Sequence, residues 1–215
     1  MVVGSTGALG AVIVQRFIRE GAQTIGASRS QATSVDGAAF IEADATDAGS
    51  VEELFRAAVN RMGHLDIVVN TVGSYVPANP ISATPPGDWD RAMDINLKST
   101  FLCTRAAIRC MRGRRFGRVF NTAAQSGVFP ESGKAAYSIS KSGVILLTEL
   151  AAQELRGTGI TINVIAPGII DTASNRAEMP NADFSKWAKP ESIADAICNL
   201  CSEEAGNITG STLQF

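Results

Sequence analysis

Short β-branched runs alternate with longer segments of helical periodicity, and this alternation is the strongest constraint on the fold. The expected strands are Val2–Val3, Thr24–Ala27, Phe40–Glu42, Asp66–Asn70, Val119–Asn121, Thr161–Ile165 and Ser211–Phe215. The expected helices are Leu9–Glu20, Val51–Met62, Trp89–Met111, Ala135–Leu155 and Ser192–Cys201. Strands that alternate with helices predict right-handed crossovers. The sequence therefore predicts an α/β fold with a doubly wound, mostly parallel seven-stranded sheet and helices on both faces.

The composition fits one globular domain over residues 1–215, because 45% of the residues are hydrophobic and no repeat or linker interrupts the pattern. The net charge of −2 gives no electrostatic footprint for nucleic acid or an anionic membrane. No apolar segment is long enough to span a bilayer, and no signal peptide is visible. Only two strand residues, Val2 and Val3, precede the glycine loop, and the chain stops on its last expected strand, so we expect both ends of the chain to be trimmed.

Cys198 and Cys201 form a C-x-x-C pair, which raises the question of a metal or redox site. The segment around them reads as an amphipathic helix, a second ligand pair is missing, and the single histidine, His64, is distant in sequence. We therefore expect no metal. Reduced thiols in a cytoplasmic protein are the better interpretation.

A G-x-x-G-x-x-G loop, Gly4-Ser5-Thr6-Gly7-Ala8-Leu9-Gly10, lies between the first expected strand and helix. Without side chains, such a loop lets the backbone approach a pyrophosphate, while the helix N-terminus supplies N–H groups. Glycine-rich turns are also common where strands simply end. It is therefore the position between a strand and a helix that indicates dinucleotide binding. The loop predicts a dinucleotide cofactor.

Ser28 and Arg29 follow the second expected strand, where an NAD-dependent enzyme usually carries an acidic residue for the ribose 2′-hydroxyl. A serine and a guanidinium would accept a 2′-phosphate that a carboxylate repels. The pair predicts NADPH in preference to NADH. The alternative is that Arg29 is only a solvated surface charge.

Tyr137 and Lys141 are one helical turn apart and so share a helix face. A neighbouring ammonium favours the phenolate, which makes tyrosine a usable acid–base group. The plainer interpretation is a core tyrosine beside an exposed lysine.

The motifs occur in an order that resembles the short-chain dehydrogenase/reductase family along nearly the whole chain. They are the glycine loop, Asp44-Ala45-Thr46-Asp47, Asn70-Thr71-Val72-Gly73, Asn96, the Tyr137/Lys141 pair, and Pro167-Gly168-Ile169-Ile170-Asp171-Thr172. The resemblance implies a single Rossmann domain that binds its cofactor through Gly4, Thr6, Gly7, Leu9, Gly10, Ser28, Arg29, Asp44, Ala45, Asn70, Gly73, Tyr137, Lys141, Pro167, Gly168, Ile170 and Thr172.

The resemblance also implies individual roles. Tyr137 would donate the proton, Lys141 would hold the nicotinamide ribose, and Asn96 would hold a water that relays protons toward Lys141. Ile170 and Thr172 would fix the nicotinamide carboxamide. For Asn96 and Thr172 taken singly, turn or cap chemistry is the alternative.

One position departs from the family pattern. The family serine stands 13 residues before the tyrosine, and that position is Ala124. Loss of one such donor commonly costs a few kcal/mol of transition-state stabilisation. Ser126 is two residues further on and would substitute only after a rearrangement of the loop.

The dihydropteridine reductase-like branch lacks this serine, and this chain resembles that branch also in residues 171–187. Segment 173–189 is expected to close over the substrate as a lid, with Met179, Phe184 and Trp187 as apolar contacts; ordinary packing of the segment is the alternative. A conjugated dihydropterin needs less carbonyl polarisation than a ketone. The branch, however, carries the acidic residue that selects NADH, unlike Ser28-Arg29.

Three hypotheses about function follow. The first is an NADPH-dependent reductase of a small conjugated carbonyl or imine, resembling a dihydropteridine reductase. The second is a carbonyl or 3-oxoacyl reductase that tolerates Ala124, and the third is a non-catalytic NADP-binding sensor or scaffold. The resemblance further implies a homodimer or homotetramer with a small-molecule substrate.

Overall fold

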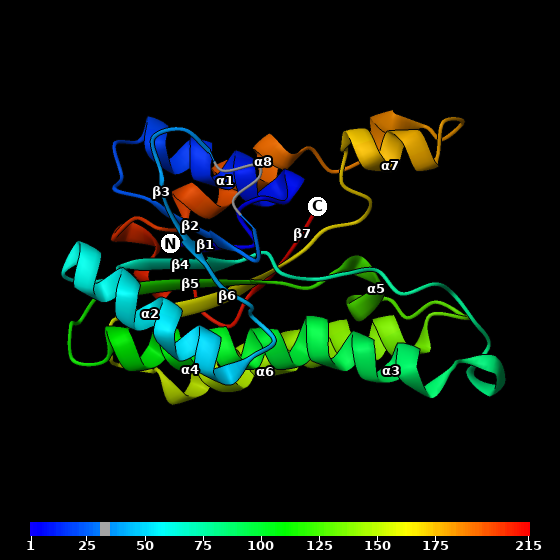
Figure 1. Cartoon of the computed structure of the whole chain (residues 1–215), viewed down its shortest axis with the longest axis horizontal. Helices are drawn as coiled ribbons and strands as arrows, with labels where there is room; N and C mark the ends of the chain where they lie inside the picture. Colours follow the sequence, from blue (N-terminus) through cyan, green and yellow to red (C-terminus); the bar gives the residue numbers. More distant parts are fainter. Residues whose placement is uncertain (31–34) are drawn as a thin grey trace.

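The computed structural model of the chain describes residues 1–30 and 35–215 and is built on one seven-stranded sheet (Figure 1). The strands are β1 (Val2–Val3), β2 (Ile25–Ser28), β3 (Ala39–Glu42), β4 (Ile67–Asn70), β5 (Gly117–Thr122), β6 (Ile160–Ala166) and β7 (Thr212–Gln214). Their spatial order is β3-β2-β1-β4-β5-β6-β7, and every pairing is parallel. The sheet predicted as mostly parallel is thus entirely parallel, and its order reverses between β1 and β4, where such folds bind ligands.

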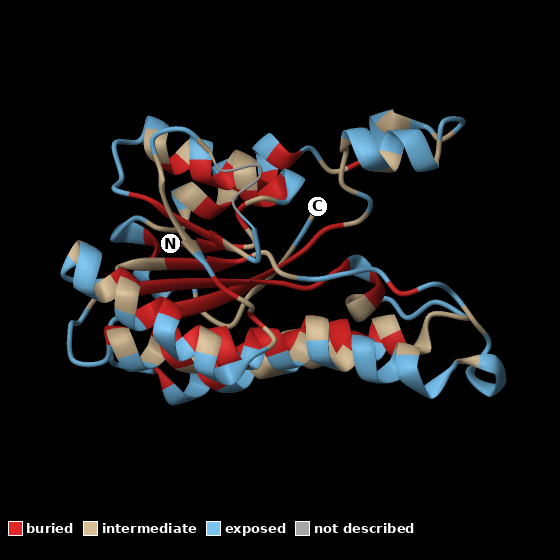
Figure 2. Ribbon diagram, viewed as in Figure 1, coloured by how far each residue is buried: buried red, intermediate tan, exposed pale blue. Residues whose placement is uncertain are grey.

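Helices cover both faces of the sheet, as the sequence predicted. On one face α1 (Ala8–Arg19) packs beside α8 (Pro190–Asn199) (Figure 1). On the other face lie α2 (Ala48–Met62), α4 (Ser99–Met111) and α6 (Ala135–Glu154). Each helix turns an apolar stripe toward the strands, so the sheet lies inside the molecule (Figure 2).

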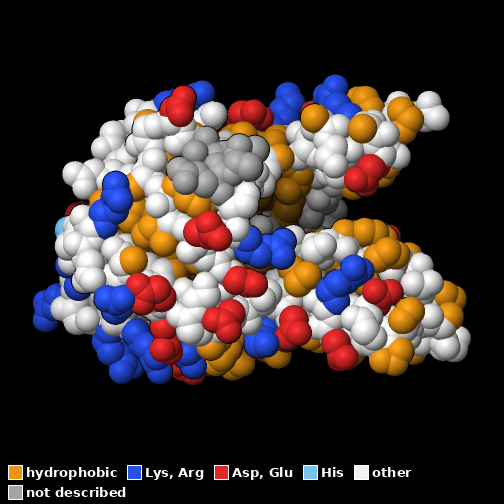
Figure 3. Space-filling view, viewed as in Figure 1, with side chains coloured by type: hydrophobic (Ala, Val, Ile, Leu, Met, Phe, Trp, Pro, Cys, Tyr) orange, Lys and Arg blue, Asp and Glu red, His pale blue; other side chains and the backbone are white. Residues whose placement is uncertain are grey.

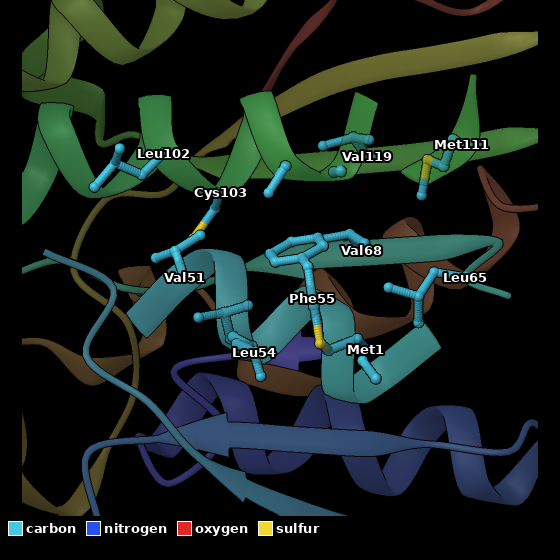
Figure 4. Packing of buried hydrophobic residues seen from close by; sticks show 14 of the residues in the cluster. Met1, Val51, Leu54, Phe55, Leu65, Val68, Leu102, Cys103, Met111 and Val119 are labelled. Carbon is cyan, nitrogen blue, oxygen red and sulfur yellow. The ribbon is translucent and has the colours of Figure 1, made fainter. Parts of the chain in front are cut away.

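The larger part of the core lies between the sheet and α2 and α4. Phe55 of α2 projects between Val68 of β4 and Val119 of β5, and all three are at most 2% exposed (Figure 4). Burial of one such side chain contributes about 1.5–3 kcal/mol. This core fixes the positions of the strands, and the predicted site residues follow the carboxyl ends of these strands.

The helix expected over Trp89–Met111 is longer and is irregular in its middle. It begins as α3 (Pro86–Ala92), with proline at its first position, widens into the π-helical turn η2 (Met93–Lys98), and continues as α4. The sequence did not predict the short elements η1 (Ile81–Ala83), α5 (Gln125–Val128), α7 (Ala173–Glu178), η3 (Phe184–Lys186) and η4 (Glu204–Asn207). They are too short to show a helical period.

All four cysteines are free thiols. The helix expected to reach Cys201 ends at Asn199, so Cys198 lies in α8 and Cys201 follows it. Burial raises the pKa of Cys103 and of Cys201 to about 12. In residues 1–30 and 35–215 there is no cluster of His, Cys, Asp and Glu that fits a metal ion, and no helix there could cross a membrane.

Candidate active site

The carboxyl ends of the parallel strands meet at one edge of the sheet, and the predicted site residues follow these ends. A notch opens at this edge between the part of the surface formed by α7 and the part formed by α3 (Figure 3). In an open α/β sheet this is where ligands bind.

The glycine loop has the geometry of a phosphate cradle. Gly4 has a φ of +86°, and its N–H donates to the Ala27 carbonyl (2.7 Å). A Cβ on Gly10 would collide with the Gly4 carbonyl oxygen, and one on Gly4 would lie 2.6 Å from Thr71 Oγ1. Gly7 caps α1 without a side-chain hydrogen bond and is exposed. The N-terminus of α1 thus begins at an exposed glycine without a side-chain cap, which suits a pyrophosphate.

Ser28 and Arg29 lie beside this loop at the end of β2. The Ser28 hydroxyl accepts a hydrogen bond from the Thr6 N–H (3.2 Å), which fixes the serine against the glycine loop. Arg29 is exposed, and its positive charge contributes to a lowered pKa of Asp44, after the hydrogen bonds from Thr46. Arg29 is therefore near Asp44, one of the predicted cofactor-binding residues.

Asn70, Thr122 and Lys141 form a hydrogen-bonded chain across the ends of β4 and β5. Thr122 Oγ1 donates to the Asn70 carbonyl (2.8 Å), and Lys141 Nζ donates to the Thr122 carbonyl (3.0 Å). A Cβ on Gly73 would lie 2.7 Å from Lys141 Nζ. A Cβ at position 73 would therefore displace the ammonium group from its present position.

Asn96 lies in the π-helical turn and is fully buried. Its Oδ1 accepts from the Ser74 N–H (2.8 Å), and its Nδ2 donates to the Ser74 carbonyl (3.1 Å) and to Ser140 Oγ (3.0 Å). The amide therefore clamps the loop after β4 to α6. These contacts occupy the side chain that the resemblance assigned to a water relay.

Tyr137 and Lys141 occupy one face of α6, as their spacing predicted. Lys141 is 3% exposed, and burial lowers its pKa to about 8. Burial, followed by the effect of Tyr75, raises the pKa of Tyr137 to about 12. Lys141 Nζ is 6.0 Å from the centre of the Tyr137 ring. The phenol therefore keeps its proton at neutral pH, and a second charge beside it would be needed to favour the phenolate.

Ala124 lies at the end of β5, just before α5, and is 7% exposed. Ser126 is inside α5 and is also buried. The side chain of the neighbouring Gln125 binds the C-terminal residue, since its Nε2 donates to the Phe215 carbonyl (2.9 Å).

The predicted residues after β6 form the base of the α7 segment. The Pro167 carbonyl accepts from the Gln125 N–H (2.9 Å), and the Gly168 N–H donates to the Phe215 carbonyl (3.0 Å). Ile170 pairs with Ala188 in an isolated parallel bridge, and Thr172 caps α7. Ile170 and Thr172 are thus held at the carboxyl edge of β6.

The expected apolar contacts differ in exposure. The rings of Phe184 and Trp187 pack together with centroids 4.7 Å apart. Trp187 is only 8% exposed, whereas Phe184 and Met179 are half-buried. Trp187 is thus buried, and Met179 and Phe184 are the members with accessible surface.

Four further residues belong to the site. Thr122, Ser74 and Ser140 hold Lys141 and Asn96 through the hydrogen bonds given above. Tyr75 is 54% exposed, and its ring stands edge-on to Tyr137 with centroids 5.3 Å apart. No motif marked these positions; the only signal for Ser74 and Tyr75 was that they directly follow Gly73.

Comparison with known proteins agrees with this arrangement. A family model described as enoyl-(acyl carrier protein) reductase matches residues 4–215. The 3-oxoacyl-(acyl-carrier-protein) reductase of Haemophilus influenzae is 32% identical over 99% of this chain and 94% of its own length. That of Vibrio cholerae is 29% identical over 99% and 93%, and glucose 1-dehydrogenase 2 of Bacillus subtilis is 31% identical over 99% and 91%.

The fold and the site define an NAD(P)H-dependent oxidoreductase with a Rossmann-type sheet. The chain belongs to the short-chain dehydrogenase/reductase family.

Proposed function

We propose that the protein is an NADPH-dependent reductase in which Tyr137 is the proton donor. The convergence of Tyr137, Lys141 and Gly73 at the carboxyl edge of the sheet carries this proposal, because the Lys141 ammonium group lies in the space that glycine leaves open at position 73. The glycine loop supports a dinucleotide cofactor, because its glycines carry no side chains and leave room for the pyrophosphate.

The nicotinamide, when bound, supplies a hydride. The phenol of Tyr137 is protonated at neutral pH and gives its proton to the substrate atom that becomes electron-rich. Lys141, held by the Thr122 carbonyl, supplies positive charge on the same helix face and binds the nicotinamide ribose. Asn96 acts as a positioning residue, since it holds Ser74 and Ser140 in place. Asp44, Ala45 and Asn70 complete the cofactor site.

For the substrate we propose a small conjugated carbonyl or imine, such as a quinonoid dihydropterin. Ala124 supports this choice, because position 124 has no hydroxyl to polarise a carbonyl and a conjugated acceptor needs less polarisation. Segment 173–189, with Met179 and Phe184 on its accessible surface, would cover such a substrate.

A 3-oxoacyl thioester is the second candidate, favoured by the names of the relatives above. We further propose NADPH over NADH, on the exposed Arg29 beside Ser28, and a homodimer or homotetramer in the cytoplasm. The exposed apolar residues Phe101, Leu146 and Leu150 of α4 and α6 support self-association.

Paired steady-state assays test the substrate and the cofactor together. NADPH and NADH are each combined with a quinonoid dihydropterin, a 3-oxoacyl thioester, and a panel of ketones and quinones. We expect the highest kcat/KM with NADPH and the dihydropterin. Good turnover of thioesters or ketones with none of the dihydropterin would refute the first substrate and favour the second. A higher kcat/KM with NADH would refute the cofactor preference.

A further inference from the structure

Residues 172–187, here called the lid segment, leave the body of the protein and rejoin it at a single place. Ile170 and Ala188 form a parallel bridge, flanked by hydrogen bonds from Asp171 N to the Ala188 carbonyl (2.8 Å) and from Ala188 N to the Ile169 carbonyl (2.9 Å). Figure 1 shows α7 standing apart from the sheet, and Figure 3 shows the notch beside this part of the surface. The bridge therefore fixes the base of the lid segment, and contacts within the segment contribute to its shape.

A continuous row of side chains crosses the lid segment from this base. Arg176 makes a two-pronged ion pair with Asp171, from Nε to Oδ1 (2.5 Å) and from Nη2 to Oδ2 (2.8 Å). The Arg176 guanidinium carbon lies 4.6 Å from the centre of the Phe184 ring, which packs on the buried Trp187. The ion pair thus joins the base to α7, and the cation–π contact joins α7 to η3.

The acidic partner lies between two residues that the family resemblance assigns to the nicotinamide carboxamide. Asp171 is directly between Ile170 and Thr172, and its side chain is 18% exposed. Asn175 Nδ2 also donates to the Ile170 carbonyl (2.7 Å), which adds a second tie between α7 and the base. Loss of the ion pair would therefore change the position of the lid segment relative to the backbone at residues 170–172.

We propose that Asp171 and Arg176 are a positioning pair, which holds the lid segment as a preformed unit over the notch and so determines the affinity for substrate. This role rests on the proposed reductase function. The pair does not touch the reacting atoms, so its loss affects KM and leaves proton transfer from Tyr137 unchanged. An exposed ion pair and a single cation–π contact each contribute little free energy. We therefore expect their loss to change KM by about three- to tenfold.

Hydrogen exchange of the lid-segment amides tests the structural half, in protein without added substrate. Asp171→Asn and Arg176→Gln should each speed exchange of residues 172–187 by about three- to tenfold. Asp171→Glu, which keeps the charge, should recover most of the protection. Glu53→Gln is the matched control, since Glu53 and Arg56 form a similar two-pronged exposed pair on α2. Unchanged exchange in Asp171→Asn would overturn the proposal.

Steady-state kinetics with the best substrate test the functional half. The substrate KM should rise about three- to tenfold in Asp171→Asn and Arg176→Gln, with kcat within twofold of the parent. The double variant should be no worse than either single variant, because the shared interaction is already lost. A KM that stays constant while exchange rises would overturn the positioning role. A parent protein without turnover would refute the proposed function instead, since the exchange experiment reports on the ion pair independently.

Discussion

Lys141→Met should make the protein more stable near neutral pH while it removes activity. The Lys141 ammonium is buried, and its pKa is lowered from 10.5 to about 8. At 1.36 kcal/mol per pKa unit, keeping this group charged in the folded protein costs about 3 kcal/mol at pH 7. Met has a similar length and no charge. It leaves the Thr122 carbonyl without the ammonium donor, which costs about 1–2 kcal/mol.

The net expectation is a gain of about 1–2 kcal/mol in the free energy of unfolding at pH 7, or roughly 2–8 °C in Tm. The sign of the pH dependence follows from the lowered pKa. Between pH 8 and pH 10.5 the unfolded chain binds the proton that folded Lys141 has lost, so the parent becomes more stable as pH rises. The advantage of the variant should therefore fall by about 2.5 kcal/mol between pH 7 and pH 10, which leaves the variant about 0.5–1.5 kcal/mol less stable than the parent at pH 10.

Urea unfolding of the parent and of Lys141→Met at pH 7, 8, 9 and 10, without cofactor, measures this difference. Lys186→Met is the control, because Lys186 is 79% exposed and its replacement should change stability by less than about 0.5 kcal/mol. A difference between parent and Lys141→Met that stays constant from pH 7 to pH 10 would refute the reasoning, as would a clear loss of stability at pH 7. The same variant should lose at least about 100-fold in kcat/KM.

Three further variants test other parts of the site. Gly73→Ala places a Cβ 2.7 Å from Lys141 Nζ, so kcat/KM should fall about 10–100-fold with the free energy of unfolding nearly unchanged; normal kinetics would contradict the packing. Asn96→Ala removes three hydrogen bonds and should cost about 3 kcal/mol in urea unfolding, whereas the exposed control Asn60→Ala should cost less than about 0.5 kcal/mol. Arg29→Ala should raise the Kd of NADPH about tenfold and leave that of NADH within twofold; equal weakening would remove the argument for phosphate recognition.

The sequence predicted the sheet, the large helices and the shared face of Tyr137 and Lys141, because each depends on a local period or spacing. It did not predict the contact of Lys141 with the Thr122 carbonyl, since a main-chain acceptor 19 residues away leaves no residue signature. The clamp of Asn96 on Ser74 depends on the π-helical turn, which a simple 3.6-residue period does not reveal.

The structure of the lid segment likewise could not be predicted from a local sequence pattern. Its residues suggested a cover for the substrate, yet α7 has only six residues, and its shape comes from an ion pair and two ring contacts. Trp187 is buried against the Phe184 ring, although its residue type alone was equally consistent with a surface contact.

Single-turnover reduction of the best substrate by Tyr137→Phe tests the central claim most directly, because phenylalanine keeps the ring and removes only the proton donor. With cofactor affinity within threefold of the parent, the rate of NADPH oxidation should fall by about 100- to 10,000-fold. A rate equal to that of the parent would show that Tyr137 is not the acid and that the site works in another way.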